Sequence, residues 1–351
     1  MSAPAPSMYS DAAKQTATSL GLKMGRANLD EFASTLQTLA QSDRNVLAVT
    51  SDSRGSGKLA PYAKALPNQI VEVGIAEQNL VGIAAGLASC GKTVFAVSPA
   101  CFLTARSFEQ IKNDVAYSDN PVTLVGISAG VSYGALGTTH HSLHDFAALR
   151  AVNNLVICAP ADNYETREAV RAAAALGRPV YLRFGKAPVY SLPGTVPFAF
   201  GRARQIFPVG ASSLATSAPP VASKLAPTLD VAFLASGETV IHALLAAAHL
   251  EATAGLRCRV LSIPTIKPLD EAAVLACAAD CRAVVTVEEH LVNGGLGEAV
   301  ASLLARRGAA RAFAIAGIPD EYTVTGSQAD IFRHYGLTME GLAATAVALL
   351  R

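Results

Sequence analysis

Short apolar runs alternate with longer amphipathic runs along most of the 351-residue chain. The short runs are rich in Val, Ile and Leu, which predicts buried strands, and the longer runs place apolar residues at helical spacing. Such alternation is typical of a mostly parallel sheet that is covered by helices on both faces. The predicted strands lie within residues 45–51, 68–74, 93–98, 121–128, 154–160, 179–184, 231–236, 258–263, 283–289 and 312–318.

A stretch rich in Pro, Ser and Ala interrupts this alternation and divides the chain into two halves. We therefore predict an α/β fold of two doubly wound domains, each a mostly parallel sheet with helices on both faces. The first helix of the first domain is predicted to begin with Asn28 as its cap and Glu31 three residues on. The predicted parts are an N-terminal tail (1–27), a first domain (28–192), a linker with an insertion (193–228) and a second domain (229–351).

Composition and charge exclude several classes of protein. The chain is 51% hydrophobic and 16% charged, and Lys+Arg 28 nearly balance Asp+Glu 27, so a nucleic-acid or membrane-surface partner has no electrostatic basis. No run reaches the roughly 18 apolar residues of a membrane span, and the start lacks a secretory pattern, so we expect a cytoplasmic protein. The six cysteines are scattered along the chain, a distribution typical of reduced thiols.

Two motifs resemble ligand-binding sites, but their residues do not match the requirements of those sites. The stretch SDSRGSGKLA (51–60) ends in Gly-Lys like a phosphate loop, yet Asp52 replaces its first glycine and Leu59 its hydroxyl residue. We therefore interpret it as a loop at a strand end. Three imidazoles follow close together, at His140, His141 and His144. Their spacing does not suit a metal site, so we predict a polar loop that faces a substrate and no metal ligands in this chain.

Glu77 is the most informative residue. It stands in the first turn of the helix predicted in VEVGIAEQNLVGIAAGLASC (71–90), where a carboxylate ordinarily complements the helix dipole. Its neighbours are small or aliphatic, which implies that the side chain is buried. Burying a carboxylate without a partner costs more free energy than its interaction with the helix dipole contributes. Glu77 is therefore expected to have a hydrogen-bonding ligand.

These residues resemble a known family. VGIAEQNLVGIAAG, FLTARSFEQIKNDVAY and GALGTTHHS are similar, in this order, to the pyrimidine-binding half of the transketolase superfamily, which includes deoxyxylulose phosphate synthases and split transketolases. VAFLASGET and VEEHLVNGGLG resemble the family's C-terminal domain. The resemblance implies a transferase of two-carbon ketol units that uses thiamine diphosphate and Mg²⁺.

The resemblance also implies roles for individual residues. Glu77 matches the glutamate that hydrogen-bonds N1′ of the aminopyrimidine, and a carboxyl in a dry pocket can share a proton with that nitrogen. His140 matches the histidine that polarises a substrate oxygen. The remaining matches are Phe102 and Phe108 for the pyrimidine pocket, Asp52 and Ser56 for the cofactor and substrate loop, and Lys186, with Arg183 as a second candidate, for the acceptor phosphate.

The chain departs from the family pattern in two ways. It contains no Gly-Asp-Gly, the motif that holds Mg²⁺ and the cofactor's diphosphate, so we expect a separate partner subunit and an α₂β₂ assembly. Leu136 stands where ordinary transketolases have an aspartate that recognises a donor hydroxyl, Ser128 replaces a substrate-contacting histidine, and Ala105 replaces a stacking aromatic. Losing a polar contact relaxes discrimination at that hydroxyl, which favours a branched or modified donor such as apulose 4-phosphate.

Two other functions share this fold. The chain could be the β subunit of a thiamine diphosphate-dependent 2-oxoacid dehydrogenase, although GTTHHS and FLTARSF resemble transketolase more closely. It could also be a non-catalytic regulatory subunit that kept the fold. The presence of Glu77 and His140 argues against this function.

Overall fold

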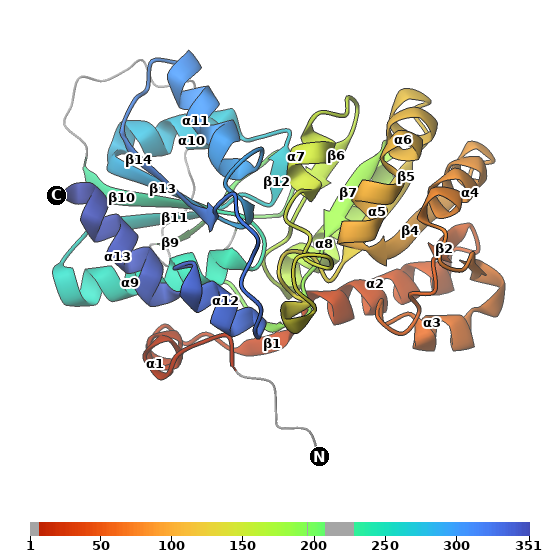
Figure 1. Ribbon diagram of the computed structural model, residues 1–351, viewed down its shortest axis with the longest axis horizontal. Coiled ribbons are helices and arrows are strands. Elements are labelled where there is room, and N and C mark those ends of the chain that lie inside the picture. The colour runs from red at the N-terminus through yellow and green to blue at the C-terminus, as the bar shows by residue number, and fades with distance from the viewer. Residues whose placement is uncertain (1–6, 195, 208–227) are drawn as a thin grey trace.

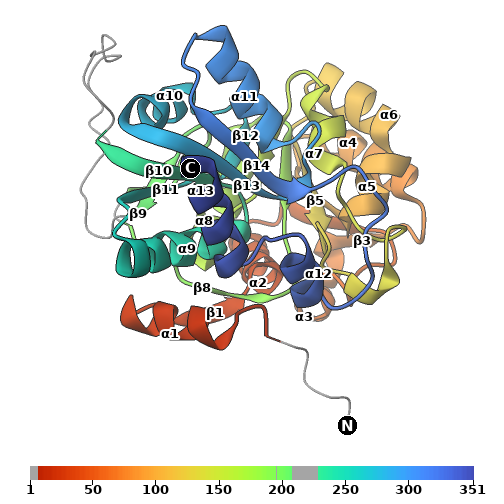
Figure 2. The same ribbon diagram turned by 60° about the vertical axis from the view of Figure 1, so that its left-hand side comes forward.

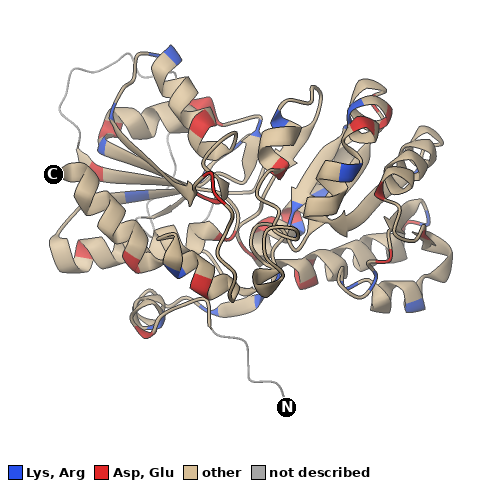
Figure 3. Ribbon diagram, in the orientation of Figure 1, with Lys and Arg blue, Asp and Glu red and all other residues tan. Residues whose placement is uncertain are grey.

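The structure is a computed structural model that describes residues 7–194, 196–207 and 228–351. Two sheet-based domains lie side by side (Figure 1), which confirms the predicted α/β architecture. Charges of both signs are scattered over both domains (Figure 3). Within the described ranges, no helix is both long and apolar enough to cross a bilayer.

The first domain is built on a seven-stranded sheet in the order β12-β6-β7-β5-β4-β2-β3. All neighbouring strands are parallel except β12, which pairs antiparallel with β6 at one edge. The central strands are buried on both faces, and this explains their nearly continuous apolar sequences. The strands are β2 (Val46–Thr50), β3 (Ile70–Glu72), β4 (Thr93–Pro99), β5 (Val122–Ile127), β6 (Val156–Cys158), β7 (Val180–Arg183) and β12 (Thr265–Lys267).

Helices cover both faces of this sheet and enclose two apolar cores. On one face lie α4 (Glu77–Ser89), α5 (Ala100–Arg106), α6 (Phe108–Gln110), the π-helix η2 (Ile111–Tyr117) and α7 (Asp145–Arg150). On the other lie α2 (Asn28–Ser42), α3 (Ala60–Ala65) and α8 (Asn163–Leu176). Two short 3₁₀ turns, η1 (Pro67–Gln69) and η3 (Gly134–Leu136), lie in the connecting loops.

The helix predicted over residues 102–117 is interrupted at Ser107. The Ser107 hydroxyl donates to the carbonyl of Leu103 one turn back, an interaction that bends helices. The chain then continues as α6 and η2, and the N–H of Ser118 donates to the carbonyl of Asn113, five residues back. Local hydrogen bonding of this kind leaves little trace in the apolar spacing.

The predicted cap of α2 is wrong. Ala27 occupies the cap position without a side-chain hydrogen bond, and Asn28 is the first helical residue. The buried Asn28 amide instead donates to the carbonyl of Ala161 at 3.3 Å and to Oε1 of Glu238 at 3.2 Å. Tertiary partners, one of them on the second domain, therefore take the side chain that the local pattern assigned to the cap.

The second domain has a five-stranded sheet in the order β14-β13-β10-β11-β9, parallel except for β9. Its strands are β9 (Arg204–Phe207), β10 (Leu229–Ala235), β11 (Cys258–Ser262), β13 (Cys281–Leu291) and β14 (Ala312–Ile318). Its helices are α9 (Thr239–Ala254), α10 (Glu271–Asp280), α11 (Leu296–Arg306), α12 (Gln328–His334) and α13 (Met339–Leu350). One apolar core runs from α4 across both domains to α10 and α11.

Two segments that were predicted to be tail and linker take part in the fold. In the tail, α1 (Asp11–Ser19) packs on α9 (Figure 2), and β1 (Met24–Ala27) pairs with β8 (Pro188–Tyr190). Within the predicted linker, β9 adds an edge strand to the second sheet. The rest of the predicted insertion, residues 208–227, lies outside the described residues. The boundaries of the domains themselves stay a prediction.

Candidate active site

Glu77 lies at the carboxyl edge of the first sheet, as the first residue of α4 after β3. Its side chain is 5% exposed, and Leu80 and Val81 in the next turn are fully buried, so the predicted burial is confirmed. Such a position suits a ligand, because ligands bind open α/β sheets outside the carboxyl ends of the strands.

Glu77 has a protein partner that the sequence did not reveal. Nη1 of Arg106, at the end of α5, lies 2.9 Å from Oε1 and 3.1 Å from Oε2 of Glu77. The Arg106 side chain is 48% exposed, so the ion pair borders solvent on one side. Each carboxylate oxygen retains capacity to accept a further hydrogen bond. Glu77 can therefore receive a donor from a ligand while Arg106 stays in place.

Aromatic and cationic side chains continue from this ion pair along the sheet edge. The Arg106 guanidinium lies 4.2 Å from the Phe102 ring centre, and the His140 ring stands edge-on to Phe102 at 5.3 Å between ring centres. His140 is also edge-on to Tyr133, over whose ring Nζ of Lys186 lies at 4.6 Å. We call this set the contact series: Glu77, Arg106, Phe102, His140, Tyr133 and Lys186.

Other predicted residues lie near the series without joining it. Phe108 packs against the apolar core, which is the role of an ordinary core aromatic. Asp52 follows β2 with a positive φ of 51°, and its N–H donates to Oε1 of Glu72. The Ser56 hydroxyl donates to the carbonyl of Ser53 in the same loop. The structure thus places Asp52 and Ser56 in the loop that follows β2, at the carboxyl edge of the sheet.

Ser128 and Leu136 belong to the loop that follows β5 and carries His140. We call residues 128–142 the substrate loop. Ser128 is buried with a positive φ of 53°, directly after the strand. Leu136 is 55% exposed in η3, so an apolar side chain faces the solvent in the loop where ordinary transketolases place an aspartate.

Lys186 and Arg183 have different environments although they are close in sequence. Arg183 is buried: its Nε donates to Oδ2 of Asp145 at 2.7 Å, and its Nη2 donates to the carbonyls of Ser142 and Glu289. The bonds to Asp145 and Ser142 lie within the first domain, and the bond to Glu289 reaches the second. The Arg183 guanidinium is thus already occupied by protein acceptors and is not placed to bind a phosphate, which corrects that second candidate. Lys186 is exposed, and burial of part of its side chain, aided by nearby Lys58, lowers its pKa.

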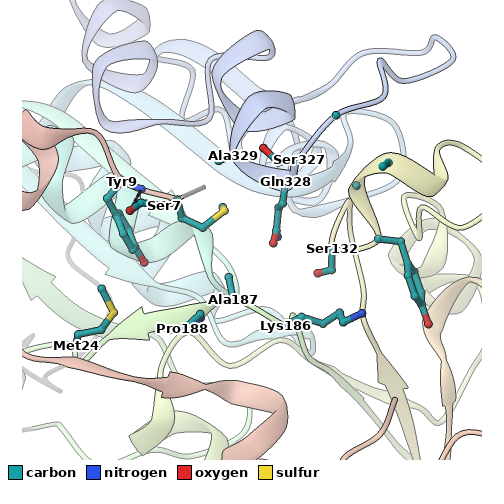
Figure 4. A pocket seen from close by; sticks show the side chains of 15 residues that line it. Ser7, Tyr9, Met24, Ser132, Lys186, Ala187, Pro188, Ser327, Gln328 and Ala329 are labelled. Carbon is teal, nitrogen blue, oxygen red and sulfur yellow. Dashed lines mark hydrogen bonds between the residues drawn. The ribbon is translucent and has the colours of Figure 1, made fainter. Parts of the chain in front are cut away.

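A cavity of about 730 Å³ opens beside Lys186 at the junction of the domains (Figure 4). Ser132 and Lys186 from the first domain border it, and Gln328 lies opposite them on the second domain. The N-terminal segment closes another side with Tyr9 and Met24. The phosphate end of the predicted site therefore lies where three parts of the chain meet.

The three histidines do not converge on a metal. His141 is buried and bonds to Thr323 and Gly134, whereas His144 lies 3.5 Å from the hydroxyl of Thr104. In the part of the chain that the structure describes, no three His, Cys, Asp or Glu side chains are placed to hold a metal ion. The donor set does fit an aminopyrimidine, with a buried carboxylate acceptor at Glu77 and an apolar ring face at Phe102.

Comparison with known families covers nearly the whole chain. Residues 26–190 match the transketolase pyrimidine-binding domain, and residues 222–342 match the transketolase C-terminal domain. A Phocaeicola vulgatus protein, named as one subunit of an apulose-4-phosphate transketolase, is 43% identical over 320 residues, 91% of this chain and 96% of its own length. This chain belongs to the transketolase family.

Two further similarities concern transketolases that are divided into subunits. A Clostridium sp. protein named 6-deoxy-6-sulfo-D-fructose transketolase subunit SqwH is 33% identical, over 78% of this chain and 80% of its own length. The solved structure "Split gene transketolase, inactive beta4 tetramer" is 31% identical with a TM-score of 0.77, and the match covers 93% of this chain and 99% of that one. The chain is therefore similar, over most of its length, to transketolase proteins that are named as separate subunits.

Three residues in or beside the candidate site were missed from the sequence. Arg106 lies 29 positions from Glu77 on another helix, and a single Arg in an amphipathic run gives no sign of its partner. Tyr133 was not distinguished from other loop aromatics. Thr323 belongs to the second domain, whose proximity to the substrate loop only the tertiary structure shows.

Proposed function

We propose that this chain, with a partner that holds the cofactor's diphosphate and Mg²⁺, transfers a two-carbon ketol unit from a ketose phosphate to an aldose phosphate. The observation that carries the proposal is the buried Glu77 at the start of α4, joined through Arg106 and Phe102 to His140. Thiamine diphosphate, when bound, supplies a nucleophilic carbon and then holds the electrons of the broken C–C bond.

Glu77 and Phe102 would hold the aminopyrimidine end of that cofactor. The buried Glu77 carboxylate would accept a hydrogen bond from N1′ and would favour the protonated ring nitrogen, because a buried anion gains from a neighbouring positive charge. Phe102 offers an apolar face that adds binding without competing hydrogen bonds. Phe108, which packs against the core, supports this pocket from behind.

His140 and Lys186 would bind the sugar phosphates. Nδ1 of His140 lies 3.0 Å from the Thr139 hydroxyl, and the edge-on contacts with Phe102 and Tyr133 restrict the imidazole further. A ring that is held in this way can donate to or accept from a substrate oxygen with little loss of entropy. Lys186 lies at the other end of the contact series, where an ammonium can pair with a phosphate.

We further propose a branched or otherwise modified donor, such as apulose 4-phosphate. The exposed Leu136 offers no hydrogen bond to the donor hydroxyl, and the relatives described above are named for apulose 4-phosphate and for a sulfo sugar. The test is the ratio of kcat/KM on apulose 4-phosphate to that on xylulose 5-phosphate. We expect the ratio to favour apulose 4-phosphate and Leu136→Asp to reduce it. A ratio near one that Leu136→Asp leaves unchanged would contradict the proposal.

A partner subunit is supported by the surface of α4 and its surroundings. Ile75, two residues before α4, is 75% exposed, and Gln78 and Asn79 in the first turn of α4 are also exposed. Apolar side chains on an open face are typical of a protein interface. We propose that this face meets the diphosphate-binding subunit in an α₂β₂ heterotetramer, which brings Glu77 and the diphosphate site together.

The decisive experiment co-expresses this chain with a candidate Gly-Asp-Gly subunit and measures thiamine diphosphate and Mg²⁺ binding by calorimetry. We expect binding in the mixture and not by this chain alone; equal affinity for the chain alone would contradict a divided site. In the mixture, Glu77→Gln should lower ketol transfer by about 10²–10⁴-fold. Glu168→Gln on the surface of α8 is the matched control. Turnover of pyruvate with an artificial electron acceptor would instead indicate a 2-oxoacid dehydrogenase.

We also propose a cytoplasmic location. All six cysteines are free thiols, and five of them are buried. A reducing compartment maintains thiols in this state. Alkylation of the protein in intact cells, followed by mass spectrometry, would detect any disulfide that contradicts this assignment.

A further inference from the structure

The second domain contacts the substrate loop through the segment that joins β14 to α12. Thr323 in this segment is 7% exposed, and its Oγ1 lies 2.7 Å from Nδ1 of His141 and 3.2 Å from Oγ1 of Thr138. The backbones also approach closely, since a Cβ added to Gly134 would stand 2.7 Å from the carbonyl oxygen of Gly326. We call this set of contacts the clamp: Thr323, Thr325 and Gly326 against Gly134, Gly137, Thr138 and His141.

The hydrogen bonds of the clamp have a single consistent direction. Nε2 of His141 lies 2.9 Å from the carbonyl oxygen of Gly134, which can only accept, so Nε2 carries the proton. Burial lowers the pKa of His141, so the ring is neutral and Nδ1 is an acceptor. The Thr323 hydroxyl then donates to Nδ1, and the Thr138 hydroxyl donates to Thr323. Both ring nitrogens are satisfied: the Gly134 carbonyl of the loop itself sets the tautomer, and the second domain supplies the donor for Nδ1.

The shape of the substrate loop depends on this support. Gly130, Gly134 and Gly137 have φ values of 61°, 49° and 71°, a region that glycine enters without strain. Two consecutive amides, those of His140 and His141, donate to the same carbonyl of Gly137, so the two histidines move as one turn. Fixing His141 therefore fixes His140, the neighbouring residue that contacts Phe102.

A second contact anchors the start of the loop to the same domain. Oε1 of Glu289 accepts from the N–H of Val131 at 2.8 Å and from Nε2 of Gln328 at 2.9 Å. Gln328 begins α12, directly after the segment that carries Thr323. The second domain thus holds the substrate loop at both ends, and Thr323 is its contact nearest to His140 along the chain.

We propose that Thr323 is a positioning residue of the active site, through which the C-terminal domain sets the place of His140 and Leu136 for the sugar substrate. This inference rests on the proposed function, because it assigns a purpose to the substrate loop of that reaction. It gives the C-terminal domain, which contributes no member to the contact series, an indirect part in substrate binding through His141.

The test compares Thr323→Val, which keeps the shape and removes the hydroxyl, with Thr323→Ser, which keeps the hydroxyl. Thr253→Val is the matched control, because its hydroxyl donates to a carbonyl in its own exposed helix. The first measurement is hydrogen–deuterium exchange of residues 134–142 in the chain without cofactor or partner. We expect exchange of the His140 and His141 amides to be about tenfold faster in Thr323→Val, since a buried acceptor loses its donor. Thr323→Ser and Thr253→Val should match the wild type.

The second measurement is steady-state kinetics of the reconstituted complex. A positioning role predicts that Thr323→Val raises KM for the donor, lowers kcat/KM roughly tenfold and leaves thiamine diphosphate affinity unchanged. Unchanged exchange in Thr323→Val would overturn the inference, as would faster exchange with unchanged KM and kcat. A wild-type complex without ketol transfer would refute the proposed function instead, and the exchange result alone would then decide whether Thr323 holds the loop.

Discussion

The stability of the protein is expected to fall as the pH rises through neutrality, because a buried carboxyl at the domain junction must ionise. Glu238 precedes α9, and its Oε1 accepts from the Asn28 amide of the first domain. A Cβ added to Gly185 would stand 2.2 Å from Oε2 of Glu238, so the carboxyl fills the space that this glycine leaves. Burial, aided by the charge of Glu289, raises the pKa of Glu238 to about 8.

The sign of the effect follows from the protons that each state binds. Between the ordinary pKa of 4.5 and about 8, folded Glu238 holds a proton that the unfolded chain has lost. The free energy of unfolding therefore falls by about 1.4 kcal/mol per pH unit in this window, and the contribution is fully lost above the folded value. Burial raises the pKa of Glu288 and Glu289 only to about 7, so their contributions end earlier.

Two buried histidines oppose this trend at lower pH. Burial lowers the pKa of His242 and His290 to about 4, so between about 4 and 6.5 the unfolded chain binds more protons at these sites and stability rises with pH. Above 6.5 this effect ends and Glu238 dominates. From pH 6.5 to 8 the ionisation of Glu238 alone should lower the free energy of unfolding by about 2 kcal/mol, and Glu288 and Glu289 add to this fall up to about pH 7.

Urea denaturation of the full chain at half-unit steps from pH 6.5 to 8.5 measures this fall. Glu238→Gln keeps an acceptor for Asn28 and cannot ionise, so its profile should be nearly flat above pH 7, where Glu288 and Glu289 no longer contribute, and the variant should be the more stable protein at pH 8. Glu168→Gln, on the surface of α8, should keep the wild-type slope. A wild-type profile without a slope, or an equal slope in Glu238→Gln, would refute the reasoning.

Three other substitutions test single contacts. Arg106→Met leaves the buried Glu77 carboxylate unpaired. Because Arg106 is half exposed, we expect the free energy of unfolding in urea denaturation to fall by about 1 kcal/mol. An unchanged midpoint would mean that the pair contributes nothing to stability. Arg183→Met breaks a buried pair with Asp145 and should cost about 3–5 kcal/mol, seen as a large fall in the urea midpoint. A shift as small as that of Arg106→Met would contradict the stabilising role of this buried pair. Lys186→Met should raise KM about tenfold for a phosphorylated acceptor and leave KM for the unphosphorylated aldose unchanged, and equal changes for both would argue against a phosphate contact.

Features that repeat along the chain were predictable from the sequence. The strands and helices follow from apolar spacing, and the burial of Glu77 follows from its aliphatic neighbours. Both depend on residues within one or two turns of each other. The family resemblance added the order of the motifs and singled out His140 and Lys186, which both contact Tyr133 in the structure.

Features that depend on distant partners were not predictable. Asn28 looked like a helix cap, but a carboxylate 210 residues away takes its amide. From the sequence, Arg183 was a second candidate for a phosphate ligand beside Lys186. Only the structure shows that its guanidinium already pairs with the buried Asp145 carboxylate. Strand β9 was not predicted, because the composition of its segment is typical of a linker. The strand is short and lies at the edge of the sheet, where pairing with β11 is enough to form it.

The edge strand β12 has a consequence for how this polypeptide must be made. Thr265–Lys267 pair with β6, and Nζ of Lys267 donates to the Arg150 carbonyl, so the first sheet is finished by residues that leave the ribosome long after its other strands. Until then β6 is an edge strand whose unpaired backbone groups can hydrogen-bond to a strand of another chain. The first half of the chain, expressed alone, should therefore aggregate, and nascent chains released before residue 267 should need a chaperone.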